Sequence, residues 1–406
     1  MFNLHLSPEQ LEIRDTVRDF VAREIKPFAH KAERLEALDR RLSVELLDQA
    51  SRLGLRTLAL SEELGGAGAD RLTCCIVTEE LAAGDPDIAA TLAETSALGH
   101  ILFDQRMSPG QRDRFLPQFL KDDRYHLAHA AHEPGSDDAL GVNYHRPETG
   151  ETSIKTSAVR AGNAWVVNGA KTCVANAPVA RLIAVQARTG ASGVSTLLVP
   201  RDTPGLSVHE HDPAQRWFHG SSGEVVFKDC RVPAENLLGQ EVESADGRGW
   251  FPALNLGIGR AAFEAALDYA KLRVQGGRRI VEHQAIGAKL AEIAIRLEVA
   301  RSIVWQAAWA CDNPEAVADR SLADLPLQAV ATVFTSEAIY HAVKDAAECF
   351  GAMGVMRDMP LQKYVHDALA CLHSGHGASD SKLRIAEALA GYRRQPAAPV
   401  RVAEST

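Results

Sequence analysis

Apolar residues at helical spacing dominate the first part of the chain. From Ile13 to Val21 they recur at intervals of three or four positions, which places them on one face of a helix. Ser7 is suited to cap the start of that helix, and Gln10 completes a capping box with it. The pattern predicts that residues 7–125 form a helix-rich first domain.

A different pattern begins near residue 127, where short runs of β-branched residues alternate with turn residues. AWVVNGAKTCV and GEVVFKDCRV are two of these runs. The segments Ala161-Gly162-Asn163 and Asn168-Gly169 have the composition of hairpin turns. We therefore predict an antiparallel β domain that ends near Pro233.

Helical spacing returns after Gly249 and is strongest from Ile286 to Val304 and from Val330 to Val343. These two segments predict long helices that are apolar over much of their surface, so we expect a bundle that packs on itself or on another subunit. The predicted organisation is an α+β protein with a helical domain in residues 1–126, a β domain in 127–240, a helical bundle in 241–392 and a disordered tail in 393–406.

The charge balance excludes nucleic acid as a partner. The 53 acidic and 44 basic residues give a formal net charge of -9, and no basic block could neutralise a row of phosphates. The chain also lacks a run of about 18 apolar residues and a secretory signal pattern, so we expect neither a membrane span nor secretion. Seven cysteines without a C-x-x-C pair predict reduced thiols in a cytoplasmic protein.

Six motifs, in the same order along the chain, resemble those of the acyl-CoA dehydrogenase family. The first domain carries LGLRTLALSEELGGAGAD before EELAAGDPDIAATL, and the β domain carries HEPGSD, WVVNGAKTCVANA and VVFKDCRVPAENLLG. The last domain carries YAKLRVQGGRRIVEHQAIGAKLAE and CFGAMGVMRDMPLQKYVHDA. The resemblance covers nearly the whole chain and implies the fold of that family, which has a helical domain, a middle antiparallel β domain and a C-terminal four-helix bundle.

The resemblance further implies an FAD-dependent oxidoreductase that desaturates an acyl-CoA thioester. In that chemistry a carboxylate within hydrogen-bond reach takes the α-proton, while a hydride leaves the β-carbon for the flavin. The family assembles as a homotetramer, a pair of dimers, in which FAD lies between the β domain and the C-terminal bundle. We expect a homodimer or homotetramer, leave a heteromer open, and regard an electron-transfer flavoprotein as a candidate electron acceptor.

Four positions in the last domain match family residues that hold FAD. Arg273 and Gln284 match those that reach the pyrophosphate and adenosine of the neighbouring subunit's FAD. Gly351 and Gly354 match a glycine turn that lets the backbone approach the same adenosine. The alternatives are a solvated charge at a helix end for Arg273, an ordinary helix-start residue for Gln284 and a helix C-cap for the glycines.

Five candidate cofactor residues lie in the β domain: Glu133, Pro134, Ser136, Cys173 and Ala175. The first three match a loop that contacts flavin and thioester, in a version two residues shorter and with His132 where the family has Thr or Ser. The last two occupy the Trp and Thr positions of a W-I-T segment. A ring stack and a hydrogen bond near the flavin are therefore missing.

The substrate positions show the main departure from the family. Ser136, Arg248 and Gly375 match positions near the acyl-CoA, but Gly375 also stands where the family has its catalytic Glu. The candidate bases are His373 and His376, which flank this position and whose neutral imidazoles can accept a proton near a pKa of about 6.5. The alternatives are contact with a different substrate or a place in an ordinary loop. No third metal ligand accompanies the two histidines, so no metal site is predicted.

Three functions remain open at this point. The first is acyl-CoA desaturation with a substituted or missing base. The second is an oxygen-using flavin monooxygenase on the same fold. The third is a non-catalytic subunit of a heteromeric dehydrogenase, which keeps Arg273, Gln284 and the glycine turn for its neighbour's FAD. The visible absorbance of the purified protein, and its bleaching by acyl-CoA, distinguish them.

Overall fold

The first domain is helical in the computed structural model, which describes residues 5–35, 41–134, 154–190, 193–212, 219–238, 249–317, 325–373 and 378–390. Its helices are α1 Pro8–Phe20, α2 Lys26–Ala29, α3 Val44–Arg52, α4 Arg71–Ala82, α5 Pro86–Gly99 and α6 Pro109–Lys121. The capping box predicted at the start of α1 is confirmed. Ser7 Oγ accepts from the Gln10 N–H at 3.1 Å, and Gln10 Oε1 accepts from the Ser7 N–H at 3.0 Å.

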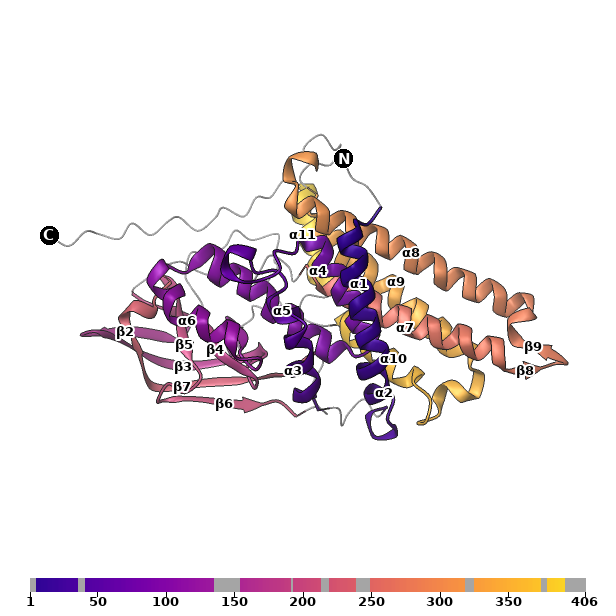
Figure 1. Ribbon diagram of the computed structural model, residues 1–406, viewed down its shortest axis with the longest axis horizontal. Coiled ribbons are helices and arrows are strands. Elements are labelled where there is room, and N and C mark those ends of the chain that lie inside the picture. The colour runs from indigo at the N-terminus through magenta and orange to yellow at the C-terminus, as the bar shows by residue number, and fades with distance from the viewer. Residues whose placement is uncertain are drawn as a thin grey trace.

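The middle domain is built on a single seven-stranded sheet, which lies at one end of the molecule in Figure 1. Its strands are β1 His126–Ala130, β2 Ser157–Ala161, β3 Ala164–Ala175, β4 Ala180–Arg188, β5 Val194–Pro200, β6 Leu206–Glu210 and β7 Ser222–Pro233. The order in space is β1-β4-β2-β3-β7-β6, with β5 paired to β4. The predicted β domain is thus confirmed, and its last strand ends at the predicted Pro233.

The sheet is mixed, so the prediction of a wholly antiparallel domain was wrong. β1 pairs with β4 in parallel, with Leu127 opposite Leu182, and β2 meets the end of β4 in parallel. Parallel neighbours need a long crossover connection rather than a hairpin, and here the β2–β3 hairpin lies within it. Local turn signals reveal hairpins only, which is why the parallel pairing escaped the sequence pattern.

One of the two predicted hairpin turns is confirmed and the other is wrong. Gly162 and Asn163 join β2 to β3, with Gly162 at a φ of 61°. Gly169 instead lies inside β3, at a φ of 142° and beside a register shift. A Cβ at this glycine would lie 2.7 Å from the Thr156 Cα, so the close approach of the neighbouring backbone explains the glycine.

The C-terminal domain is a helical bundle. Its elements are α7 Phe251–Leu272, the short strands β8 Val274–Gln275 and β9 Arg278–Arg279, α8 Gln284–Asp312, α9 Leu327–Cys349, α10 Leu361–His373 and α11 Ala378–Ala390. The two long helices expected from the apolar spacing are α8 and α9. Helices α7 to α10 form the predicted four-helix bundle, and α11 adds a fifth helix against α9.

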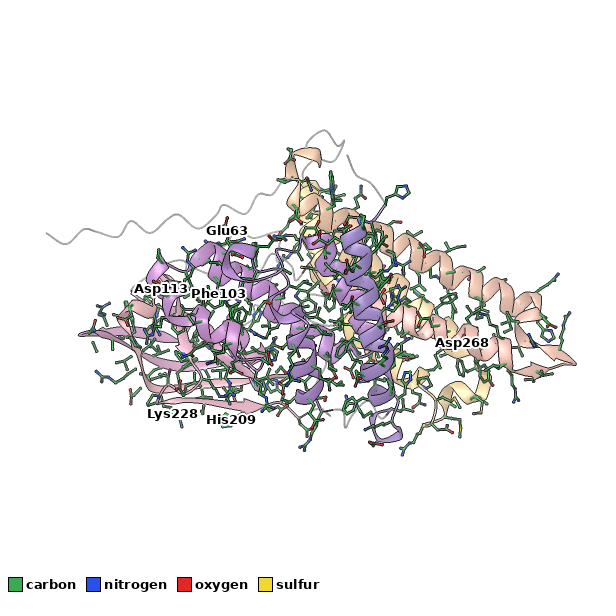
Figure 2. The ribbon with its side chains drawn as sticks, viewed as in Figure 1. Glu63, Phe103, Asp113, His209, Lys228 and Asp268 are labelled. Atoms are coloured by element: carbon green, nitrogen blue, oxygen red, sulfur yellow. The ribbon has the colours of Figure 1, made fainter. Side chains whose placement is uncertain are left out.

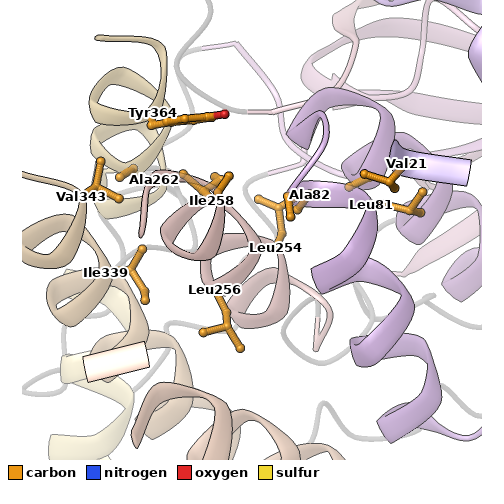
Figure 3. Packing of buried hydrophobic residues seen from close by; sticks show 14 of the residues in the cluster. Val21, Leu81, Ala82, Leu254, Leu256, Ile258, Ala262, Ile339, Val343 and Tyr364 are labelled. Atoms are coloured by element: carbon orange, nitrogen blue, oxygen red, sulfur yellow. The ribbon is translucent and has the colours of Figure 1, made fainter. Parts of the chain in front are cut away.

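Helix α7 packs against both helical domains. Its Gly257 allows a close approach to α4, because a Cβ there would lie 2.5 Å from the Glu79 carbonyl oxygen. Gly259 faces α9, where a Cβ would lie 2.8 Å from Ile339. Figure 3 shows the resulting core, in which Leu254 and Ile258 of α7 lie between Leu81 of α4 and Ile339. The two helical domains therefore share one hydrophobic core.

None of the helices in the described part of the chain is both long and apolar enough to cross a membrane.

Candidate functional site

A buried ion pair fixes the loop that follows β1. Lys171 of β3 is fully buried, and its Nζ lies 2.9 Å from Oε1 of Glu133, whose side chain is 4% exposed. The carboxylate also accepts from the backbone N–H groups of Lys155 and Thr156 at 2.6 and 2.8 Å. The candidate Glu133 therefore uses its carboxylate inside the protein, which leaves its backbone for any contact with flavin.

The charge of Glu133 follows from this environment. Burial alone would raise the pKa of Glu133, but hydrogen bonds from Thr156, Lys155 and Lys171 outweigh it and hold the pKa below its usual value. Lys171 Nζ also donates to the Ala131 carbonyl oxygen at 2.8 Å. The ion pair thus joins the start of this loop to the middle of β3.

The end of β3 is strained where the candidate Cys173 lies. Cys173 has a φ of 51° within a bulge that interrupts the pairing of β3 with β7, and its side chain is half-buried. The neighbouring Thr172 donates its N–H to the His132 carbonyl oxygen at 2.9 Å, so Cys173 lies beside the loop of Glu133 and Pro134. A strained backbone of this kind often marks a functional site.

Asn176 attaches the end of β3 to the first domain. The residue is buried at a φ of 62°, and its Nδ2 donates to the carbonyl oxygens of Thr91 and Leu127 at 3.0 and 3.3 Å. Because Thr91 belongs to α5, the candidate Ala175 is held next to that helix. The loop after β1 and the end of β3 therefore form one candidate surface of the β domain.

The second group of candidates lies together at the far end of the bundle. Arg273 follows the last residue of α7, with its N–H bonded to the Tyr269 carbonyl oxygen at 2.8 Å and its side chain exposed. Gln284 begins α8 and is exposed too. Tyr269 stacks on Phe350 at the end of α9, with ring centroids 4.1 Å apart, so the α7 and α9 ends meet here.

The geometry of the glycine turn is compatible with both a helix C-cap and a turn that lets the backbone approach adenosine. Gly351 follows the C-cap of α9 at a φ of 57°, as a helix-ending glycine does. Among the described residues, nothing lies within 4 Å of the position where its Cβ would be, so a ligand can approach this backbone. Gly354 packs onto α9, since a Cβ there would lie 2.5 Å from the Ala347 carbonyl oxygen.

The two groups of candidates are far apart within one chain. Figure 1 shows the sheet at one end of the molecule and the β8–β9 hairpin, which follows Arg273, at the other. In Figure 2, Asp268 of α7 is likewise remote from His209 and Lys228 of the sheet. A single chain therefore does not bring Arg273 and Cys173 to the same cofactor.

Other candidates lie outside the described residues: Ser136, Arg248, Gly375 and His376. His373 is described, as the exposed last residue of α10. The structure thus places one of the two candidate bases at a helix end.

The residues present fit FAD. At the bundle end, the exposed guanidinium of Arg273, the carboxamide of Gln284 and the open backbone at Gly351 are groups that bind phosphate and adenosine. At the β domain, Cys173 is half-buried beside the loop of Pro134. The two partial sites lie at opposite ends of the molecule, and this arrangement suits a cofactor that two subunits share.

A cavity that the sequence pattern did not reveal lies between the first domain and the bundle. Its volume is about 240 Å³, and its lining comes from α4, α5, Trp250 before α7, and the ends of α8 and α9. Its apolar lining comes from Leu55, Leu58, Val77, Leu81 and Leu92, and its polar lining includes Arg71, His100, Gln105 and Arg106. Leu55, Leu58, Leu81 and Leu92 lie in two of the family motifs, but the motifs do not show that a cavity forms, because it arises only when distant helices pack together.

Two thiols add to the apolar lining of this cavity. Burial raises the pKa of Cys74 to about 12, and burial raises the pKa of Cys75 further. Both side chains are therefore protonated at neutral pH and act as small apolar groups. None of the seven cysteines, all of which lie within the described residues, forms a disulfide.

Family models match three consecutive parts of the chain. Residues 7–123 match the N-terminal domain of acyl-CoA dehydrogenase, residues 147–230 its middle domain and residues 245–389 its C-terminal domain. The three ranges fall in the first helical domain, the β domain and the C-terminal bundle, respectively, and β1 lies between the first two ranges.

Individual proteins are similar over nearly the whole length. An acyl-CoA dehydrogenase of Bacillus subtilis (strain 168) is 30% identical over 378 residues, which cover 90% of this chain and 93% of the relative. The mitochondrial short-chain specific acyl-CoA dehydrogenase of Rattus norvegicus is 30% identical over 370 residues, covering 88% and 84%. The structure of butyryl-CoA dehydrogenase from Megasphaera elsdenii superimposes with a TM-score of 0.81 at 25% identity, covering 96% of this chain and all of that one.

Proposed function

The chain belongs to the acyl-CoA dehydrogenase family and is an FAD-dependent oxidoreductase, and from this premise we propose that it desaturates an acyl-CoA thioester between the α- and β-carbons. FAD, when bound, supplies the acceptor for the hydride that leaves the β-carbon. The residues of the chain bind the two molecules, exclude water and take the α-proton. The comparisons do not favour the flavin monooxygenase or the non-catalytic subunit.

The main support for this proposal is the cavity between the first domain and the bundle. Its volume of about 240 Å³ has room for about eight water-sized groups, which is the size of a short or medium acyl chain. Ala93 and Ala97 of α5 line the cavity, while Thr91 on the same helix receives Asn176 of the β domain. An acyl chain in the cavity would therefore lie beside the helix on which the candidate flavin surface docks.

The substituted base is the part of the proposal that departs from the family. We propose that an imidazole nitrogen of His376 or His373 accepts the α-proton, because Gly375 has no side chain that could accept it. Arg248 and Ser136 are proposed to hold the thioester. Glu133 and Lys171 are proposed to keep the loop of Pro134 in place rather than to contact the substrate.

The visible spectrum and its bleaching test this function. The purified protein is expected to carry bound flavin, and acyl-CoAs of about four to eight carbons are expected to bleach it anaerobically, because chains of this length suit the cavity volume of about 240 Å³. Ala97→Leu should shift the preference to shorter chains, while Ala97→Ser, which keeps the volume, should not. Flavin that no thioester bleaches would count against desaturation, and a protein without flavin would indicate the non-catalytic subunit.

Arg273→Ala is expected to weaken FAD retention by about 10- to 100-fold, since a charge-assisted bond to phosphate contributes about 1.5 to 3 kcal/mol. Gel filtration followed by absorbance measures the remaining flavin. Arg278→Ala is the matched control, because Arg278 is an exposed arginine of the adjacent strand β9. Equal flavin contents in the Arg273 and Arg278 variants would contradict the assignment.

We further propose a homotetramer in the cytoplasm, with an electron-transfer flavoprotein as the electron acceptor. Exposed apolar side chains on α8, with Ile295 61% and Val299 47% exposed, and the two partial FAD sites support an assembly of several copies. Light scattering should give a mass near four times 43.9 kDa. Ile295→Asp should lower the measured mass, whereas Val159→Asp, at an equally exposed position of the sheet, should leave the mass unchanged.

A further inference from the structure

A buried charged cluster lies where the three domains meet. His219, in the connection between β6 and β7, has a side chain that is only 6% exposed. Its Nδ1 lies 3.5 Å from Oδ1 of Asp87 in the first turn of α5, and its Nε2 lies 3.0 Å from the backbone carbonyl oxygen of Asp367 in α10. One side chain of the β domain therefore contacts both helical domains.

The geometry determines the charge of His219. Nε2 faces a backbone carbonyl oxygen, which can only accept, and the Asp87 carboxylate at 3.5 Å from Nδ1 favours a second proton there, so the surroundings of the ring favour an imidazolium. Burial alone would lower the pKa of His219, but Cys371, Asp87 and Asp367 outweigh it and raise the pKa to about 10. The acidic groups around the ring therefore favour its charged form.

The other ionisable groups on the C-terminal side of the cluster belong to α10. Lys363 Nζ lies 3.0 Å from Oδ2 of Asp367, and His366 Nδ1 lies 3.9 Å from its Oδ1. Cys371 lies within hydrogen-bonding range of the imidazole.

On the side of the first domain, Asp85 pairs with Arg34 at 3.3 Å. The Gly220 N–H donates to Oδ1 of Asp87 at 3.0 Å, next to the imidazolium. The negative charge of Asp87, 2% exposed, thus balances the buried positive charge of His219.

We propose that His219 is a positioning residue, whose imidazolium ties α10 to α5 and so holds in place the end of α10, which carries the candidate base His373. His373, the last residue of α10, lies six positions after Asp367, which is about 9 Å along a helix. A shift of α10 at Asp367 would therefore carry the candidate base away from the thioester. This role rests on the proposed function, whereas the link between α5 and α10 does not.

The test compares His219→Gln, which can hydrogen-bond but has no charge, with His219→Arg, which keeps the charge. The control is His211→Gln, because His211 belongs to the same connection and its Nδ1 lies 3.1 Å from Oγ of Ser222 within the β domain. At pH 7, His219→Gln is expected to speed hydrogen exchange in α10 by about tenfold or more, since it removes a charge-assisted bond. The rate of flavin reduction should fall by a similar factor at unchanged flavin content, and His219→Arg should restore much of it.

The pH dependence provides a second measurement that needs no variant. Because the pKa of His219 is higher in the folded protein than the usual 6.5, its stabilisation is complete below about pH 6.5 and is lost as the pH rises through about 10. Exchange in α10, corrected for its intrinsic rate and compared with α8, should therefore increase between pH 7 and 10. In His219→Arg this increase should be absent.

Unchanged α10 exchange in His219→Gln, or in the parent between pH 7 and 10, would overturn the link. Faster exchange with an unchanged rate of flavin reduction would overturn the positioning role. A parent protein whose flavin no acyl-CoA reduces would overturn the proposed function instead, and hydrogen exchange would still decide whether His219 holds α10.

Discussion

Gly375→Glu is expected to raise the rate of anaerobic flavin reduction by acyl-CoA by about 10² to 10⁴, which is the usual contribution of a positioned general base. The family's catalytic Glu falls on this position, two residues after the last residue of α10. Position 375 lies outside the described residues, so the expectation comes from the sequence and from the chemistry of the α-proton. Stopped-flow measurement of flavin bleaching gives the rates of parent and variant.

Gly377→Glu is the matched control, because it adds the same charge two residues further along the chain. The dependence of the rate on pH distinguishes a histidine base in the parent from a glutamate base in the variant. If an imidazole takes the proton in the parent, the rate of the parent should rise with pH around 6.5, which is the usual pKa of histidine. With glutamate as the base, the rise should occur at lower pH. Fast reduction by the parent and no gain in Gly375→Glu would contradict the proposal that the missing carboxylate limits the rate.

Lys171→Met is expected to lower the free energy of unfolding by about 3 to 5 kcal/mol, because it leaves the buried carboxylate of Glu133 without its cation. The loop after β1 should loosen as well, since Lys171 also bonds the Ala131 carbonyl oxygen. Urea unfolding measures the stability, and flavin content reports the state of the loop. The loss should shrink in acid, because protonation of Glu133 removes the uncompensated charge.

Lys155→Met is the matched control for that variant. Lys155 is exposed, and the bond that it makes to Glu133 comes from its backbone N–H, which the substitution keeps. Its unfolding free energy should stay within about 0.5 kcal/mol of the parent. A loss in Lys171→Met no larger than in Lys155→Met would mean that the buried pair does not hold the loop.

The candidate site was predictable from the sequence only in part. The motifs indicated Arg273, Gln284 and Gly351, and the structure brings these to one end of the bundle with exposed side chains or an open backbone. The motifs also indicated Glu133 but could not show that its carboxylate faces Lys171. Which way a side chain points depends on the packing around it, and that packing is not written in a short motif.

Two further features came only from the structure. The cavity is lined by residues from 55 to 328, and the His219 cluster joins residues near 87, 219 and 367. Each set combines segments that lie far apart in the chain. Such groups form when segments separated by many residues pack together, so no local pattern announces them.

The sequence by itself determined the elements whose signals are local. The capping box of Ser7, the apolar spacing of α8 and α9 and the turn at Gly162 each depend on residues a few positions apart, and each is confirmed. Only the tertiary structure decided the parallel pairing of β1 with β4, the place of Gly169 inside a strand and the charge of His219. These depend on partners that are distant in the chain, because strand pairing, backbone contact and burial of charge are fixed by what packs nearby in space.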